Sequence, residues 1–185
     1  GALTRLLETL GYSDQSGVFQ HKERTAVFVG DFIDAGHKQR AVLDLVMPMV
    51  AEGHAKAIMG NHEFNALGFH TLAGGEKNWL RRRTDKNIKQ HIRFLDEYLG
   101  DSVELERVLD FFWSLPLWLE LGGARIVHAC WDEGAITRIG NMHSGPKLTP
   151  ELLKLASIDT NDEYDDVELL LKGKELPLPK ESAPF

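Results

Sequence analysis

Two carboxylates stand at the end of an apolar run near the start of the chain. In "VFVGDFIDAG", residues 27–36, the run stops at Asp31 and Asp34, which lie between Gly30 and Gly36. A carboxylate can bridge two cations, and the glycines let the backbone turn tightly and approach a ligand closely. The segment is therefore a candidate site for metal-dependent chemistry.

Two later segments have the same setting. Asn61, His62 and Glu63 follow the apolar residues of "AKAIMG", and His128 comes near the end of the apolar stretch "LWLELGGARIVHAC" (117–130). In a parallel α/β sheet, ligands bind beyond the carboxyl ends of the strands, so we expect the three groups to meet on one rim. Carboxylate, amide and imidazole donors suit Mn²⁺, Fe²⁺ or Zn²⁺.

Each group taken alone has a simpler explanation. Asp31 and Asp34 are of a residue type that is common in turns and at helix N-caps. The stretch "GNHE" (60–63) fits a turn followed by a helix cap, and a histidine such as His128 on an apolar strand is more often a core residue. The agreement of residue type, order and strand context across three separate segments favours a shared site.

The elements that must position these groups follow from hydrophobic periodicity. Leucines at helical spacing predict a helix over residues 3–10. Residues 25–31 are typical of a buried strand, residues 38–53 of a helix that Pro48 must kink or shorten, and residues 55–62 of a second buried strand. A strand–helix–strand unit implies a parallel pair with a right-handed crossover.

The second half of the chain changes its pattern. Residues 76–114 favour broken helices, and residues 117–130 favour two strands around Gly122–Gly123, which is a hairpin signal. Residues 131–172 favour short helices and loops. Within them the acidic segment 159–168 is expected to be a solvated surface, because it lacks the spacing of an EF-hand.

Composition excludes several classes of protein. The 185 residues are 43% hydrophobic and 26% charged, which is ordinary for a globular domain. The net charge of −7 argues against a nucleic-acid binder, because phosphate backbones select for excess Lys and Arg. No apolar run is long enough to cross a membrane. Cys130 is the only cysteine, so a reducing, cytoplasmic compartment is expected, with a buried and inert thiol.

Three stretches resemble signature motifs of one family. "GDFIDAG" (30–36), "GNHE" (60–63) and "GGARIVHA" (122–129) are similar to the second, third and fourth motifs of the calcineurin-like metallophosphoesterases. This superfamily includes protein Ser/Thr phosphatases and diadenosine tetraphosphatases, and bacterial members share the phrases "GNHEFNA" and "HACWD". The resemblance implies an α/β fold, a sandwich of two mixed β-sheets flanked by helices.

The resemblance also implies a metal site. Asp31 matches the carboxylate that bridges two metals, Asn61 matches an amide ligand of the second metal, and His128 matches a histidine ligand of that metal. The implied cofactors are two divalent ions of Mn, Fe or Zn. The implied reaction is in-line attack on phosphorus by a water that the metals activate.

The same resemblance implies an acid. His62 matches the imidazole that protonates the leaving oxygen, and Asp34 and Glu63 match carboxylates that orient it. Asn61 and His62 would also contact the substrate. The implied substrates are a small phosphate ester, a dinucleoside polyphosphate or a phosphoprotein.

The chain departs from the family pattern at several points. The first motif, Asp-x-His, is not found, so we expect residues 1–185 to be a single domain that lacks its first strand and is incomplete at the N-terminus; completeness at the C-terminus stays open. The last motif, Gly-His, is not found, and His143 is the only histidine after His128. Ala35 replaces an arginine that would grip phosphate. Arg81, in the basic run 81–83, is our candidate replacement, although such a run is more often a solvated loop or helix face.

Two classes of function compete. The first is a metal-dependent phosphoesterase. The second is a metal-binding or interaction domain of the same fold that has lost catalysis, which Ala35 and the missing first motif favour. Asn61 and His62 favour the enzyme, because a non-enzyme has no chemical need for that pair. A nucleotide-binding protein is a poor third, since the chain has neither Gly-x-Gly-x-x-Gly nor a P-loop lysine.

Overall fold

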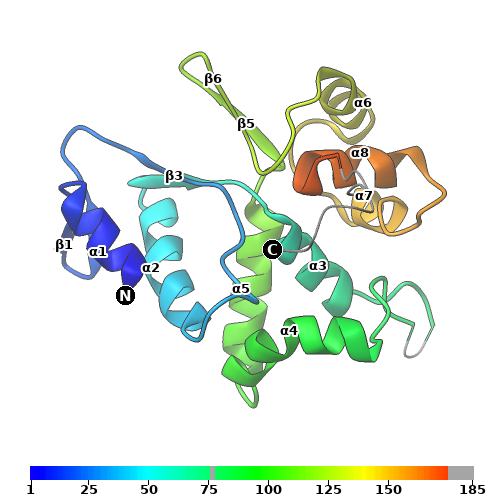
Figure 1. Cartoon of the computed structure of the whole chain (residues 1–185), viewed down its shortest axis with the longest axis horizontal. Coiled ribbons are helices and arrows are strands. Elements are labelled where there is room, and N and C mark those ends of the chain that lie inside the picture. Colours follow the sequence, from blue (N-terminus) through cyan, green and yellow to red (C-terminus); the bar gives the residue numbers. More distant parts are fainter. Residues whose placement is uncertain (76–77, 175–185) are drawn as a thin grey trace, which may run out of the picture.

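A computed structural model describes residues 1–75 and 78–174 of the chain. The described residues form a mixed α/β structure, with the N-terminal elements at one side and the last three helices at the other (Figure 1). None of the helices in these two ranges is both long enough and apolar enough to cross a membrane.

The first part of the chain is a helix, a hairpin and a parallel strand pair. Helix α1 (Ala2–Thr9) precedes the antiparallel strands β1 (Ser13–Gln15) and β2 (Val18–Gln20). Strand β3 (Ala26–Phe28) pairs in parallel with β4 (Ala55–Ala57), and helix α2 (Gln39–Ala51) connects them. The predicted strand–helix–strand unit is therefore confirmed, whereas nothing in the sequence patterns predicted the β1–β2 hairpin.

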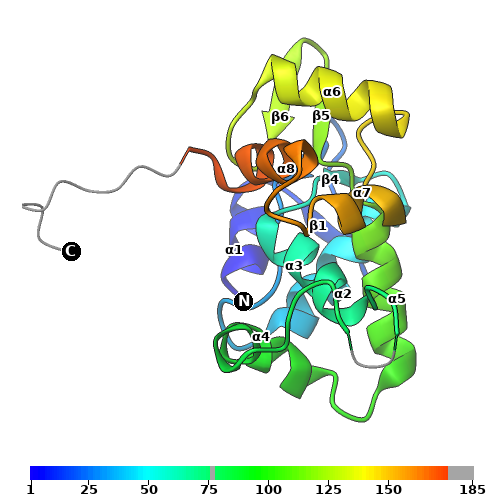
Figure 2. The same ribbon diagram turned by 90° about the vertical axis from the view of Figure 1, so that its right-hand side faces the viewer.

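The second part is mostly helical. Helix α3 (Asn61–His70) follows β4, and α4 (Asp85–Glu97) and α5 (Ser102–Ser114) come next. The hairpin of β5 (Trp118–Leu121) and β6 (Ala124–Val127) is antiparallel, as predicted. The chain continues with α6 (Glu133–His143), α7 (Pro150–Leu155) and α8 (Asp162–Lys172). Seen from the side, the hairpin and α6 lie at one end of the molecule and α4 at the other (Figure 2).

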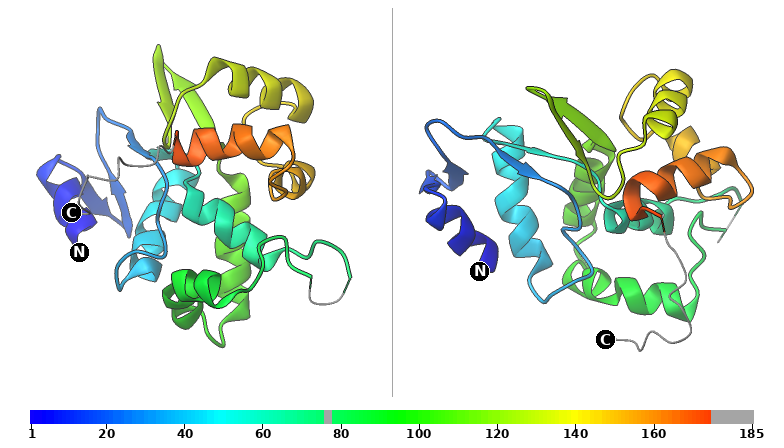
Figure 3. Two further views of the ribbon diagram at one scale, coloured as in Figure 1. Left: turned by 45° about the vertical axis from the view of Figure 1, so that its right-hand side comes forward. Right: turned by 45° about the horizontal axis from the view of Figure 1, so that its top comes forward.

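One main hydrophobic core holds these helices together. Phe94 of α4, Phe112 of α5 and Leu67 of α3 are almost fully buried in it, and Ile139 of α6 and Leu170 of α8 extend it toward the last three helices. A smaller cluster joins α1 and the first hairpin to α2 and β4. Two further views show that α3 lies between α5 and the α7–α8 pair, so the helix that carries residues 61–63 is supported on several sides (Figure 3).

Several predicted boundaries were wrong. The strands expected over residues 25–31 and 55–62 are three residues long, because the chain turns at Gly30 and enters α3 at Asn61. The residues of β3 are half-buried rather than buried. Helix α2 continues past Pro48 to Ala51, so this proline does not shorten it.

Other expectations are corrected in part. Residues 78–84 are not helical, and residues 76–77 of the predicted helical region lie outside the described residues. The acidic segment is not wholly solvated: Asp166 is buried, and its carboxylate accepts hydrogen bonds from Arg138 at 2.9 and 2.5 Å. Cys130 is half-buried rather than buried.

The α/β class is confirmed, but the described residues do not form two mixed sheets. Their strands make three separate two-stranded sheets, of which β3–β4 is parallel and the other two are antiparallel.

Candidate active site

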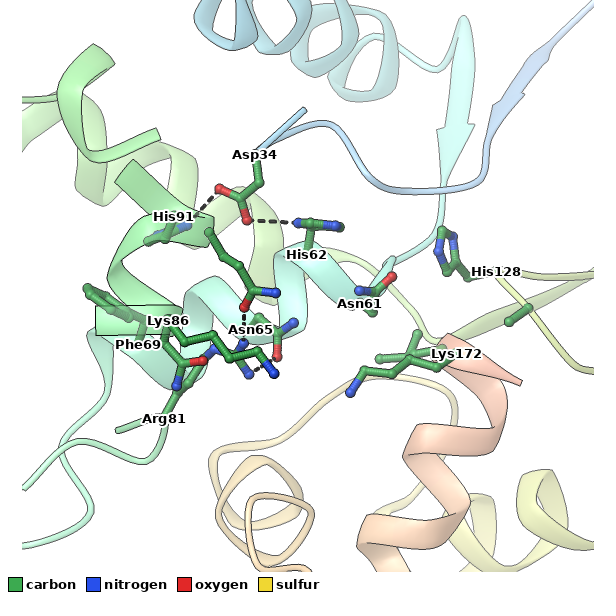
Figure 4. A pocket seen from close by; sticks show the side chains of 14 residues that line it. Asp34, Asn61, His62, Asn65, Phe69, Arg81, Lys86, His91, His128 and Lys172 are labelled. Carbon is green, nitrogen blue, oxygen red and sulfur yellow. Dashed lines mark hydrogen bonds and ion pairs between the residues drawn. The ribbon is translucent and has the colours of Figure 1, made fainter. Parts of the chain in front are cut away.

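A pocket of about 670 Å³ opens where the predicted groups converge. The loop after β3 contributes Asp34, the start of α3 contributes Asn61 and His62, and the residues after β6 contribute His128 (Figure 4). The far side is formed by α4 and by the end of α8. Three segments that are distant in the sequence thus meet at one place, as their positions after strands predicted.

A buried carboxylate fastens two of these segments together. Glu63 is fully buried, and its oxygens accept hydrogen bonds from the backbone N–H groups of Asp31 and Phe32, both at 2.8 Å, and of Gly60 at 3.0 Å. Burial raises the pKa of Glu63, and the N–H donors oppose that rise because they stabilise the ionised form. Glu63 therefore positions the loop of Asp31 against the start of α3. The expectation that Glu63 orients His62 is corrected, because its oxygens are bound to these backbone N–H groups and Asp34 holds the imidazole instead.

Two glycines make this close approach possible. A Cβ atom on Gly30 would lie 2.3 Å from the backbone nitrogen of Gly60, and one on Gly60 would lie 2.4 Å from an oxygen of Asp31. Gly30 also has a φ of 88°, in the left-handed region that favours glycine. Any side chain at either position would push the two strand ends apart.

Asp34 is held between two histidines. Its Oδ2 lies 2.8 Å from Nδ1 of His62, and its Oδ1 lies 2.8 Å from Nδ1 of His91. Burial raises the pKa of Asp34, but the hydrogen bonds from the two imidazoles outweigh it, so the pKa lies below its ordinary value. The carboxylate is thus ionised and only accepts hydrogen bonds, which makes both Nδ1 atoms donors.

The same bond prepares His62 for proton transfer. The hydrogen bond to Asp34 raises the pKa of His62 above its usual value. Since Nδ1 of His62 is bound to Asp34, the other ring nitrogen is the one available in the pocket, which His62 lines together with Asn61 and His128. An imidazole that a buried carboxylate orients in this way is suited to act as a general acid.

Sequence patterns gave no role to His91, which lies 57 residues beyond Asp34. His91 is buried on α4 among the rings of Phe69, His70 and Phe94. Its spacing of three residues from Phe94 was a signal that it faces inward, although not that it meets Asp34.

His128 and Asp31 face each other across the rim. Nδ1 of His128 is hydrogen-bonded to the carbonyl oxygen of Val29, so in the neutral ring Nδ1 carries the proton and Nε2 carries a lone pair. That Nε2 lies 3.4 Å from Oδ2 of Asp31. The carboxylate raises the pKa of His128, because two electron-rich atoms at this distance need a proton or a cation between them.

This pair has the chemistry of two metal ligands. An imidazole whose Nδ1–H is bound to a backbone carbonyl is typical of metal-ligating histidines. Asn61 lines the pocket together with His128, and Figure 4 shows it between His62 and His128 at the start of α3. Within the described ranges, no group of three or more His, Cys, Asp or Glu side chains is arranged to hold a metal. Asp31, His128 and Asn61 therefore fit part of the coordination shell of a metal ion.

Arg81 lies on the opposite side of His62 from this pair. Its guanidinium donates to Oδ1 of Asn65 at 2.7 Å and to Oε1 of Gln90 at 3.0 Å. Of the three neighbouring arginines, Arg81 alone lines this pocket: Arg82 lines a different one, and Arg83 lies over the ring of Trp79. Burial lowers the pKa of Arg81, so the basic run is not simply a solvated surface.

The sequence of the chain was compared with models of known protein families. A sequence model of the family described as calcineurin-like phosphoesterase matches residues 1–183. The chain belongs to the calcineurin-like phosphoesterase family. Members of this family are hydrolases, and the predicted resemblance is confirmed.

Two curated relatives of this phosphoesterase carry the same name. Bis(5'-nucleosyl)-tetraphosphatase PrpE (asymmetrical) of Oceanobacillus iheyensis is 44% identical over 128 residues, which are 69% of this chain and 49% of that protein. The protein of that name from Bacillus subtilis is 38% identical over 61 residues, which are 32% of this chain and 25% of that protein. The phosphoesterase chain thus spans about half of the length of one relative and a quarter of the other.

We expect the His91→Phe variant of the natural full-length protein to hydrolyse an alkyl phosphate, whose leaving oxygen needs a proton, about tenfold more slowly. Phenylalanine keeps the ring packing against Phe94 but cannot donate to Asp34, so the carboxylate that orients His62 loses one of its two anchors.

The matched control for this variant is His70→Phe. His70 belongs to the same ring cluster, burial lowers its pKa to about 4, and it makes no hydrogen bond to Asp34 among the described residues. Its replacement should leave the rate within twofold. Equal losses in both variants would mean that the cluster only packs, and that His91 has no part in positioning Asp34.

Proposed function

We propose that this phosphoesterase hydrolyses a phosphoanhydride of a dinucleoside polyphosphate with the help of divalent metal ions. The observation that carries the proposal is His62, fixed by Asp34 at one ring nitrogen and open to the pocket at the other. The names of the two relatives support the choice of a dinucleoside polyphosphate over a phosphomonoester or a phosphoprotein.

In the proposed reaction, His62 donates its Nε2 proton to the oxygen that leaves phosphorus. Asp34 keeps the ring in the orientation that this transfer needs and stabilises its charged form. Asn61 donates a hydrogen bond to the reacting phosphate at His62, and Arg81 donates to the next phosphate of the chain. Arg81 is thus our candidate for the phosphate-binding cation that the family pattern has at the position of Ala35.

Asp31, His128 and Asn61 would hold the divalent cations in this proposal. When bound, such ions supply an activated water and neutralise charge that develops on phosphate. The oxygen and nitrogen donors are compatible with Mn²⁺, Fe²⁺ or Zn²⁺. Glu63 keeps Asp31 in register with Asn61 through the backbone bonds that join the two loops.

Further properties belong to the same proposal. We infer a single domain over residues 1–185 in which β3–β4 and β5–β6 belong to the two mixed sheets of a calcineurin-like sandwich. The family match over residues 1–183 supports this assignment. A cytoplasmic location is also proposed, and the single free cysteine, Cys130, supports it.

Metal binding tests the proposal directly. We expect the natural full-length protein to bind Mn²⁺, and the double variant Asp31→Asn, His128→Ala to bind it at least tenfold more weakly, as measured by calorimetric titration and elemental analysis. The control, Asp165→Asn with His37→Ala, removes the same residue types from exposed positions outside the pocket. Equal affinity in the two double variants would remove these ligands from the proposal.

A second candidate function is a metal-binding domain that has lost catalysis, which Ala35 favours. Hydrolysis of diadenosine tetraphosphate by the natural full-length protein with Mn²⁺, followed by chromatography of the products, separates the two. Metal binding without any hydrolysis, on this substrate or on p-nitrophenyl phosphate, would favour the second candidate.

A further inference from the structure

We propose that Asn65, Arg81, Lys86 and Gln90 form a second anion subsite in the pocket, which holds the outer phosphates of a polyphosphate chain while the reacting phosphate lies at His62. The proposal rests on the proposed function, and it states that the site selects substrates with a chain of phosphates. A single phosphate would occupy the first position only, whereas a chain of phosphates would occupy both.

The subsite lies next to His62 along one helix. Asn61 and Asn65 are four residues apart on α3, so they stand about one helical turn, roughly 5–6 Å, apart on the same face. Both side chains line the pocket, and so do Arg81 and Lys86 beyond them (Figure 4). An extended anion that begins at His62 and follows α3 therefore passes Asn65 before it reaches α4.

The hydrogen bonds of Arg81 decide what this end of the pocket recognises. Arg81 donates hydrogen bonds to the side-chain carbonyl oxygens of both Asn65 and Gln90. Each amide must then present its NH₂ group elsewhere, and no hydrogen bond of these NH₂ groups is recorded within the described part of the chain. A guanidinium has five N–H donors, of which two are used here, so three are left. The cluster thus offers mainly donors, because each amide oxygen already accepts a hydrogen bond from Arg81, and this suits a ligand that has only acceptor oxygens.

The charge of this end of the pocket is also positive. The hydrogen-bond partners of Arg81 are neutral amides, although Asp34 and Glu168 are near enough to act on its charge. Both of these carboxylates are engaged elsewhere, Asp34 by two imidazoles and Glu168 by Lys172 at 2.5 and 2.7 Å.

Lys86 adds a cation that is free to move. It is exposed at the start of α4 and makes no ion pair within the described ranges. Phosphate chains carry one or more negative charges on each phosphate, so a guanidinium and an ammonium at one end of the pocket favour a chain over a single phosphate.

Tripolyphosphate binding to the metal-free, natural full-length protein tests the subsite without any turnover. We expect Lys86→Ala to weaken tripolyphosphate about five- to tenfold and Arg81→Gln to weaken it about 10- to 100-fold, in calorimetric titrations. Binding of inorganic phosphate should change less than twofold in both variants.

The control variant is Lys89→Ala, which removes an exposed lysine from the same helix at a position that does not line the pocket. It should bind both anions as the unchanged protein does. Lys86 makes no structural bond in the described residues, so its variant stays informative even where Arg81→Gln disturbs the packing around Asn65. Equal weakening of tripolyphosphate by Lys86→Ala and Lys89→Ala would overturn the subsite.

Kinetics separate this inference from the proposed function. With Mn²⁺ present, Lys86→Ala should lower kcat/KM for diadenosine tetraphosphate by the same five- to tenfold and leave p-nitrophenyl phosphate within twofold. Equal losses on both substrates would contradict a second subsite while leaving phosphoesterase activity in place. No activity on either substrate in the unchanged protein would reject the proposed function, and the tripolyphosphate titrations would still decide the subsite.

Discussion

The His62→Asn variant should hydrolyse alkyl phosphates about 10²–10⁴-fold more slowly than the unchanged protein, which is the usual contribution of a positioned general acid. His62 is bound to Asp34 at Nδ1, which leaves Nε2 to carry the proton to the leaving oxygen. Asparagine is polar and of smaller volume, but it has no proton to give at that position. The measurement is kcat in the natural full-length protein with Mn²⁺.

The dependence on leaving group identifies the role. p-Nitrophenolate leaves without help from an acid, so the loss on p-nitrophenyl phosphate should be much smaller than the loss on an alkyl phosphate. Bound Mn²⁺ should not change, because the proposal assigns the metal to other side chains. The exposed His37→Asn serves as the control, with rates within twofold on both substrates. Equal losses on the two substrates would assign His62 a different role, such as a ligand or a packing residue.

The Glu63→Gln variant should lower the free energy of unfolding by about 2–4 kcal/mol, since it leaves a buried N–H group without an acceptor. One oxygen of Glu63 accepts from Phe32, and the other accepts from both Asp31 and Gly60. Glutamine has one oxygen and one NH₂ group, so whichever way it turns, the NH₂ group faces at least one backbone N–H.

Urea denaturation measures this loss. The exposed Glu8→Gln makes the same chemical change on α1 and should stay within about 0.5 kcal/mol. A similarly small change for Glu63→Gln would show that its carboxylate does not hold the two loops together. The rate should also fall in the Glu63 variant, because Asp31 and Asn61 lose the connection that keeps them in register.

Local patterns predicted the parts of the fold that local physics determines. The apolar runs that end at Gly30 and Gly60 identified the parallel strands, because the chain has to turn where the two strand ends touch. The turn at Gly122–Gly123, with φ values of 56° and 84°, identified the second hairpin. The strand lengths could not be read in the same way, since apolar residues such as Ile58 and Met59 are buried beyond the end of β4 without belonging to it.

The site was predictable where the residues lie together in the sequence, as Asn61, His62 and Glu63 do. It was not predictable where tertiary packing brings distant groups together. His91 meets Asp34 only because α4 presents one face to the core, and Arg81 meets Asn65 because its backbone N–H bonds the carbonyl oxygen of Gly68 at 2.9 Å. Asp166 of the acidic segment is likewise buried by its ion pair with Arg138, a residue 28 positions earlier in the chain.

Helix α4 carries two neighbouring residues with different tasks. Gln90 lies beside Arg81 at the far end of the pocket, and the next residue, His91, is bonded to the carboxylate that orients His62. A shift of this helical turn therefore moves both the contact with Arg81 and the contact with Asp34. A substrate long enough to engage Gln90 would steady the same turn that holds Asp34, and part of its binding energy would then appear as faster proton transfer rather than as tighter binding. A longer substrate would then have a higher kcat than a shorter one.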